Sequence, residues 1–311
     1  MEREADCYYL LRKERCIMTI NKKLFKQVAA AALSLTMAFA LVGCGSSDSN
    51  EATASTKNPE TQTEETSSDP VTIKVGASIT PHSEILEQAK PILAEKGITL
   101  EIVQLEDYIT PNTGVIEGSL DANYCEHLPY LEQFNEENKS DLVSIGAIHY
   151  EPFGVYAGKT KSLADLPDGA TVAVPNDVTN EARALLLLAQ EGILKLKDDA
   201  GINATAADIV ENPKNIEFKE LAPEQLAASL PDVDVAVING NYAIEGGLHV
   251  KDALAVEAND GLAAKTYGNI ITTSPEKKDD AALKTLVEVL QSAEISKYIN
   301  DTYEGAVVPL Q

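Results

Sequence analysis

One arginine and three asparagines in this 311-residue chain are spaced so that they could bind a small zwitterion. Arg183 follows Asn180 by three residues on an expected helix start, and Asn239 and Asn241 follow the apolar run 233–238. A guanidinium can hold a carboxylate through two hydrogen bonds, and unpaired N–H groups at a helix N-terminus add to that attraction. Amide oxygens can accept hydrogen bonds from an ammonium group. These residues therefore indicate a pocket for a free amino acid.

Plainer interpretations of the same residues stay open. Arg183 could pair with a surface carboxylate, because the chain holds 49 acidic residues. Asn239-Gly240 is a strong hairpin dipeptide and could form a turn.

Cys125 and His127 are the second group that could do chemistry. On a strand they would lie on one face, with Glu126 on the other. Such a thiol and imidazole could be the nucleophile and base of an extracytoplasmic hydrolase. His127 could equally be an ordinary core histidine. The ligands of a metal site cannot be assembled at suitable spacing, so we expect no metal and no cofactor.

The elements that must position these residues alternate between strands and helices. Ser83 is expected to cap the first helix and Gly97 to end it. Period-two and helical patterns predict strands over 71–75, 98–102, 172–174 and 233–238, and helices over 83–97, 181–189 and 282–290. This order favours an α/β protein with largely parallel sheets.

The N-terminal region carries an export signal. An apolar run without charge, 28–42, follows three lysines within 22–26 and leads directly to Cys44. At 15 residues the run is shorter than the ~18 of a membrane-spanning helix. It resembles a bacterial lipoprotein signal, which implies removal of residues 1–43 and lipid attachment to Cys44; an ordinary signal or a buried helix is the alternative. We expect translation to start at Met18, which puts the lysines at the start of the signal.

Charge and composition describe what remains after this cleavage. Residues 1–43 hold seven of the 25 Lys and Arg and four of the 49 Asp and Glu, so the remainder has 18 basic and 45 acidic residues, a net charge of −27. Such a chain is repelled by nucleic acid and by anionic lipid. Residues 44–70 are rich in Ser, Thr and acidic residues and predict a disordered tether. We therefore expect an extracytoplasmic protein that its lipid, and not its charge, holds on the cell membrane.

Five segments together resemble the methionine-binding lipoprotein family, the solute receptors of ABC importers. The resemblance spans about 71–309 and rests on segments 107–112, 120–131, 149–154, 174–185 and 237–243. It implies a two-lobed α/β fold of the type II periplasmic-binding-protein kind, with the ligand in the cleft. Lobe 1 would comprise 70–158 and 250–311, and lobe 2 would comprise 159–249.

The resemblance also implies the site and its partners. The implied ligand is L-methionine, a related amino acid or a methionine dipeptide, passed without chemical change to an ABC permease and its ATPases. Cys125-Glu126 stands where the family usually has Phe-Gln, which would enlarge the pocket. Besides the hydrolase, a surface adhesin without a small ligand is the alternative function. The implied binding residues are Tyr108, Cys125, His127, Tyr130, Asn180, Arg183, Asn239, Asn241 and Asn269.

Overall fold

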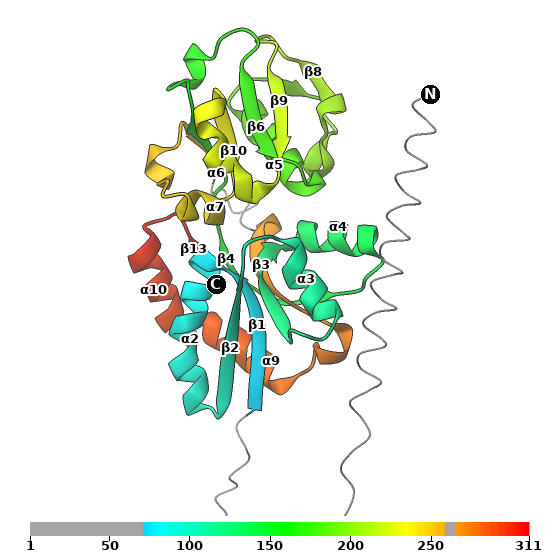
Figure 1. Ribbon diagram of the computed structural model, residues 1–311, viewed down its shortest axis with the longest axis vertical. Helices are drawn as coiled ribbons and strands as arrows, with labels where there is room; N and C mark the ends of the chain where they lie inside the picture. The colour runs from blue at the N-terminus through cyan, green and yellow to red at the C-terminus, as the bar shows by residue number, and fades with distance from the viewer. Residues whose placement is uncertain (1–70, 259–264, 311) are drawn as a thin grey trace, which may run out of the picture. The chain divides into compact units, whose positions relative to one another are not determined.

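A computed structural model describes residues 71–258 and 265–310 of the chain. Its strands form a six-stranded sheet, a five-stranded sheet and a two-stranded ribbon, and helices surround both large sheets (Figure 1). No helix within the described ranges is long and apolar enough to cross a membrane. The signal region 1–43, Cys44 and the tether predicted over 44–70 lie outside the described residues.

The first sheet has the strand order β13-β4-β12-β3-β1-β2. Its strands are β1 (Val71–Ser78), β2 (Ile98–Leu105), β3 (Ala122–His127), β4 (Val143–Tyr150), β12 (Gly268–Thr273) and β13 (Val308–Pro309). The helices around it are α2 (Glu84–Glu95), α3 (Ile109–Ile116), α4 (Leu128–Asn138), α9 (Ala281–Leu290) and α10 (Ala293–Tyr303).

The second sheet has the strand order β11-β5-β10-β6-β9. Its strands are β5 (Gly154–Ala157), β6 (Thr171–Pro175), β9 (Glu217–Leu221), β10 (Val235–Ile238) and β11 (Ala255–Val256). Helices α5 (Val178–Gln190), α6 (Leu226–Ser229) and α7 (Gly240–Glu245) lie beside it, and the ribbon joins β7 (Lys195–Leu196) to β8 (Ile209–Glu211).

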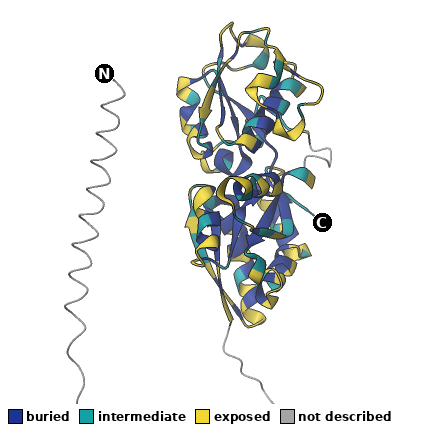
Figure 2. Ribbon diagram, turned by 90° about the vertical axis from the view of Figure 1, so that its right-hand side faces the viewer, coloured by how far each residue is buried: buried dark blue, intermediate teal, exposed yellow. Residues whose placement is uncertain are grey.

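Each large sheet has a core on both of its faces, drawn in dark blue in Figure 2. Ile73 and Val75 of β1 pack in the cluster of α2, α9 and α10. Gly76 faces the other way, where a Cβ atom would lie 2.6 Å from Leu120 Cδ1 in the cluster that α3 and α4 help to form. In the second sheet Val172 packs with α5, whereas Ala173 packs on the side of α6 and α7. Because both faces of each sheet are buried, the sequences of the central strands are nearly continuous runs of apolar residues.

The two-lobed α/β fold predicted from sequence is confirmed, with two local corrections. Helix α5 begins at Val178 and not at Glu181, because Asp177 caps it by accepting from the backbone N–H of Asn180. Ser83 does not cap α2, since its hydroxyl donates to the Ser78 carbonyl oxygen at 2.8 Å.

The prediction of largely parallel sheets is wrong, because both sheets are mixed. Strands β1, β2 and β3 run parallel, and so do β6, β9 and β10, but β4, β5, β11, β12 and β13 pair antiparallel. The antiparallel strands include those that carry the chain between the sheets. Only residues 151–153 connect β4 of the first sheet to β5 of the second, so the chain changes sheets there without an intervening helix.

The same pairings place the lobe limits differently from the limits implied by the resemblance. Strand β5 (Gly154–Ala157) precedes residue 159 and β11 (Ala255–Val256) follows residue 249, yet both are strands of the second sheet. The chain therefore passes between sheets after Tyr150 and again after Val256.

Candidate functional site

A small cavity lies where the two sheets meet. Strand ends and helix starts converge there, as is usual for ligand sites of open α/β sheets. His127 ends β3 just before α4, and Asn239 ends the β10 run just before α7. Asn239-Gly240 therefore starts a helix and does not form the alternative hairpin turn. All nine residues expected from sequence line the cavity: Tyr108, Cys125, His127, Tyr130, Asn180, Arg183, Asn239, Asn241 and Asn269.

Arg183 is buried in the second turn of α5 and is held by the segments that connect the sheets. Its Nη2 donates to Glu257 Oε2 at 2.5 Å and to the Glu151 carbonyl oxygen at 2.9 Å, and Nε donates to both oxygens of Glu257. The guanidinium also lies 4.3 Å from the centroid of the Tyr267 ring and 4.8 Å from that of Phe153. The sequence left open which acidic residue pairs with Arg183, and the structure shows that it is Glu257, a partly buried residue.

These contacts leave one end of the Arg183 side chain available. Among the described residues Nη1 has no hydrogen-bond partner, so it can still donate to a carboxylate. The pKa of Arg183 is raised despite its burial, because Glu257 faces it, so the guanidinium keeps its charge. The predicted position at the helix N-terminus is wrong, since α5 begins five residues earlier.

A chain of amide contacts fixes the polar wall of the cavity. Asp177 accepts from the side-chain nitrogen Nδ2 of Asn180 at 2.9 Å, which fixes the orientation of that amide. The side-chain oxygen Oδ1 of Asn180 then accepts from His127 Nε2 at 3.1 Å and from Asn239 Nδ2 at 2.9 Å. His127 Nδ1 accepts from the backbone N–H of Tyr130 at 3.2 Å, so the proton of the neutral ring is on Nε2. Burial lowers the pKa of His127 to about 4, and the ring is therefore neutral near pH 7.

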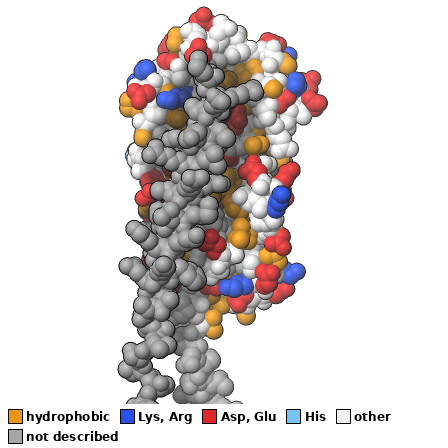
Figure 3. Space-filling model, turned by 45° about the vertical axis from the view of Figure 1, so that its right-hand side comes forward, with side chains coloured by type: hydrophobic (Ala, Val, Ile, Leu, Met, Phe, Trp, Pro, Cys, Tyr) orange, Lys and Arg blue, Asp and Glu red, His pale blue; other side chains and the backbone are white. Residues whose placement is uncertain are grey.

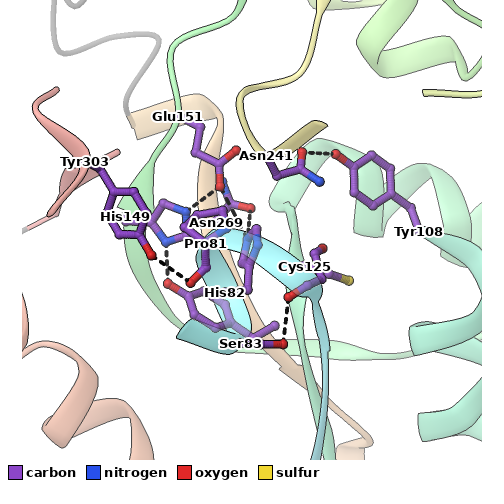
Figure 4. Close-up of polar contacts among 12 residues, drawn as sticks. Pro81, His82, Ser83, Tyr108, Cys125, His149, Glu151, Asn241, Asn269 and Tyr303 are labelled. Carbon is purple, nitrogen blue, oxygen red and sulfur yellow. Dashed lines mark hydrogen bonds and ion pairs between the residues drawn. The ribbon is translucent and has the colours of Figure 1, made fainter. Parts of the chain in front are cut away.

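Two amide atoms in this wall are buried without any partner among the described residues. They are the oxygen Oδ1 of Asn239 and the nitrogen Nδ2 of Asn241. Asn241 Oδ1 accepts from the Tyr108 hydroxyl at 2.5 Å, so the group it leaves free is a donor and not the acceptor expected from sequence (Figure 4). An unmet buried donor and acceptor cost about 1–3 kcal/mol each, which a ligand with both kinds of group would recover.

Aromatic rings form the less polar side of the cavity. The Tyr108 ring lies 5.6 Å from that of Tyr130 and 5.1 Å from that of Tyr242, and the His127 ring lies 5.2 Å from that of Tyr267. Tyr242 and Tyr267 were not among the residues expected from sequence. Tyr242 follows the Asn241 position directly, which was the signal available for it.

Cys125 and His127 do not form a nucleophile–base pair. Burial raises the pKa of the Cys125 thiol well above its usual range, and its Sγ lies 3.6 Å from Asn123 Oδ1. Both nitrogens of His127 contact other residues, Asn180 and Tyr130. The thiol is thus protonated and has no base in contact with it.

Glu126 is turned toward side chains of the first sheet and its helices. Its oxygens accept from Asn112 Nδ2 at 2.7 Å and from the Thr272 hydroxyl at 2.9 Å. Burial raises the pKa of this carboxyl to about 7.

Two acidic residues line the cavity, Glu126 and Glu151, and sequence reasoning assigned no role to Glu151. It follows β4 directly, and its Oε1 accepts from His149 Nε2 at 2.7 Å. Oε1 also lies 3.6 Å from His82 Nε2, which donates to Asn269 Oδ1 at 2.9 Å. Candidate metal-binding atoms of these residues lie within 4.8 Å of one another, but both ring N–H groups already have acceptors. We therefore interpret the cluster as a hydrogen-bond network.

The chain matches the family described as NlpA lipoprotein over residues 73–311. It belongs to that family. Among curated NlpA-type relatives, the methionine-binding lipoprotein MetQ of Bacillus subtilis is 41% identical over 92% of this chain and 99% of its own length.

Solved structures agree with this membership. A lipoprotein from Ruminococcus gnavus is 54% identical, with a TM-score of 0.76 over 77% of this chain and 99% of its own. A nutrient-binding protein from Burkholderia cenocepacia, solved bound to methionine, is 41% identical, with a TM-score of 0.73 over 77% of this chain and all of its own. The proteins that resemble this chain thus include one named as a methionine-binding lipoprotein and one solved bound to methionine.

Proposed function

We propose that this protein is a substrate-binding lipoprotein that captures L-methionine, or a related amino acid or methionine dipeptide, for an ABC importer. The observation that carries the proposal is the buried polar wall with a free acceptor, Asn239 Oδ1, and two free donors, Asn241 Nδ2 and Arg183 Nη1. A free amino acid supplies the matching ammonium and carboxylate. The relatives named for methionine binding support the choice of ligand.

Each group of the ligand then has a partner of matching chemistry. The carboxylate takes hydrogen bonds from Arg183 and Asn241, and the ammonium donates to Asn239. The thioether lies among Tyr108, Tyr130 and other rings, whose edges attract sulfur by ~0.3–1.5 kcal/mol. His127, Asn180 and Asn269 hold the wall, and Cys125 leaves room beside the side chain.

The two sheets are the lobes that close on this ligand. Closure follows if the ligand binds the closed arrangement more tightly than the open one. In the described part of the chain, the Tyr108–Asn241 and His127–Asn180 hydrogen bonds join residues on the two sides. The closed receptor docks on a membrane permease whose paired ATPases drive uptake.

The lipid on Cys44 keeps the receptor near its importer outside the cytoplasm. Acidic side chains are spread over the face in Figure 3, with fewer basic ones among them. Such a surface is repelled by anionic headgroups, so membrane attachment relies on the anchor and on the tether at 44–70.

The protein is not an enzyme in this proposal. A hydrolase would need the Cys125 thiolate and a base in contact with it, whereas that thiol is protonated and His127 is engaged elsewhere. We expect Cys125→Ser to bind the ligand as the wild type does, and we expect no loss of catalytic turnover in this variant.

A thermal-shift screen of the purified protein against the 20 amino acids and methionine dipeptides tests the proposal. A ligand at 100 times its Kd raises the free energy of unfolding by about 2.7 kcal/mol, which is readily seen as a rise in Tm. We expect stabilisation by methionine or a methionine dipeptide, with the ligand recovered intact by chromatography. Chemical conversion of the ligand would indicate the hydrolase. A Tm that none of the tested compounds raises would indicate the adhesin.

A further inference from the structure

Glu151 lies on the segment that connects the two sheets and reaches both of them. It follows Tyr150, the last residue of β4, and is 5% exposed. Its Oε2 lies close enough to α7 that a Cβ atom on Gly240 would be 2.9 Å away. The carboxylate therefore lines the cavity beside the free amide groups of Asn239 and Asn241.

A buried hydrogen-bond chain holds this carboxylate from behind. The Tyr124 hydroxyl contacts His149 Nδ1. His149 Nε2 in turn contacts Glu151 Oε1 (Figure 4). Since a carboxylate oxygen accepts, His149 carries its proton on Nε2 and its Nδ1 accepts from Tyr124. The His82 ring packs 4.9 Å from that of His149 and directs its own N–H to Asn269. Every contact in this hydrogen-bond network is consistent with an ionised Glu151 and with neutral imidazole rings of His82 and His149.

No cation neutralises Glu151 within the described residues. Burial lowers the pKa of His149 to about 3 and that of His82 to about 4, so both rings are uncharged near neutral pH. Arg183 donates to the backbone carbonyl oxygen of Glu151, while its side-chain ion pair is with Glu257. The other side chains in this network, Tyr124 and Asn269, are neutral. Within the described residues, Arg183 and Glu257 balance each other's charge, and Glu151 is left without a cation of its own.

We propose that Glu151 is the counter-charge for the ammonium group of the bound amino acid, and that His149, Tyr124 and His82 are positioning residues that keep its carboxylate directed to the cavity. This inference rests on the proposed function and adds a charge requirement to it. A ligand lacking the ammonium would leave a buried carboxylate unpaired, which is costly. The site thereby discriminates amino acids from the corresponding carboxylic acids.

The proposal links binding to pH with a definite sign. Burial raises the pKa of Glu151 in the empty protein, and a neighbouring ammonium lowers it. The empty site therefore holds a proton at a pH where the occupied site does not. Affinity for the amino acid falls as pH falls below the pKa of the empty site, by up to tenfold for each pH unit, and binding in that range releases up to one proton.

The test compares L-methionine with 4-(methylthio)butanoate, which has the same thioether and carboxylate but no ammonium. Titration calorimetry of the wild-type protein is expected to show at least 100-fold weaker binding of the acid. Glu151→Gln keeps the size of the side chain and should reduce that ratio at least tenfold. Glu126→Gln is the matched control, because Glu126 also lines the cavity but its carboxyl is held by Asn112 and Thr272 and not by His149; this variant should keep the wild-type ratio.

Two further measurements do not depend on how Glu151→Gln folds. Wild-type affinity for methionine should fall on acidification with proton release, measured in buffers of different ionisation enthalpy. Affinity for 4-(methylthio)butanoate should not fall over the pH range in which that acid itself stays ionised. His149→Leu should raise the pH at which methionine affinity falls, and His149→Gln, which keeps an N–H donor, should restore it.

The outcomes separate this inference from the function on which it rests. Equal discrimination in the wild type and in Glu151→Gln, or methionine binding without proton release across the acidic range, overturns the role of Glu151 and leaves the receptor function standing. Failure of the wild-type protein to bind methionine, its dipeptides or any other amino acid overturns both.

Discussion

Replacing Glu126 by Gln should make the free energy of unfolding less dependent on pH. Glu126 is 3% exposed, and burial raises the pKa of its carboxyl from 4.5 to about 7. The folded protein therefore binds a proton between about pH 4.5 and pH 7 that the unfolded chain has released. Stability from this group is fully present below the unfolded pKa and is lost as pH rises through the folded pKa.

The magnitude follows from the size of that rise. At about 1.4 kcal/mol for each tenfold change in proton affinity, a rise from 4.5 to about 7 corresponds to roughly 3 kcal/mol. A glutamine can accept from Asn112 and, once the Thr272 hydroxyl rotates from donor to acceptor, donate to it; a protonated carboxyl needs the same rotation. Glu126→Gln should therefore match the wild type near pH 4.5 and exceed it by up to about 3 kcal/mol at pH 8.

Urea denaturation of both proteins at several pH values between 4.5 and 8, in the absence of ligand, measures this difference. Titration of all other groups cancels when the variant is compared with the wild type at each pH. A difference that stays constant across this range, or one that grows toward acid pH, would refute the assignment of a protonated carboxyl to the Glu126 site.

Three further predictions concern the binding wall and a helix cap. Arg183→Ala should abolish methionine binding in calorimetry and lower the free energy of unfolding by about 3–5 kcal/mol, because Glu257 loses its partner. Arg183→Lys keeps the charge but lacks Nη1, so it should restore the free energy of unfolding without restoring methionine binding. Tyr108→Phe should weaken methionine binding about fivefold, the equivalent of about 1 kcal/mol for one hydrogen bond, and wild-type affinity would contradict it. Asp280→Ala removes the cap that accepts from the N–H groups of Ala282 and Leu283, so urea denaturation should show a loss of about 1 kcal/mol with unchanged methionine affinity.

Sequence reasoning predicted elements well where the signal was local. The apolar periodicity of 71–75 and 282–290 reports burial on one strand or helix, and the structure has β1 and α9 there. Strand direction in the mixed sheets depends on pairings between residues such as Val155 and Val237, which lie 82 positions apart. No local pattern records such a pairing.

The composition of the site was predictable, but its internal contacts were not. Arg183 was expected from its charge and spacing, yet its pairing with Glu257 joins residues 74 positions apart. Asn241 was expected to offer its oxygen, and only the position of the Tyr108 hydroxyl shows that the nitrogen is the free atom. Glu151 lies in segment 149–154, which helped to identify the family, but its residue type gave no sign of a binding role in a chain with 49 acidic residues.

The buried thiol of Cys125 can report how often the cavity opens. It is 2% exposed and is the only cysteine in the described part of the chain. A thiol reagent needs both access and a thiolate, and the closed cavity denies it both. In a protein whose Cys7, Cys16 and Cys44 are replaced, the rate of Cys125 alkylation reports the fraction of molecules in which the cavity is open. Bound ligand should slow alkylation in proportion to its occupancy, so the alkylation rate measures ligand affinity without an added label on the surface.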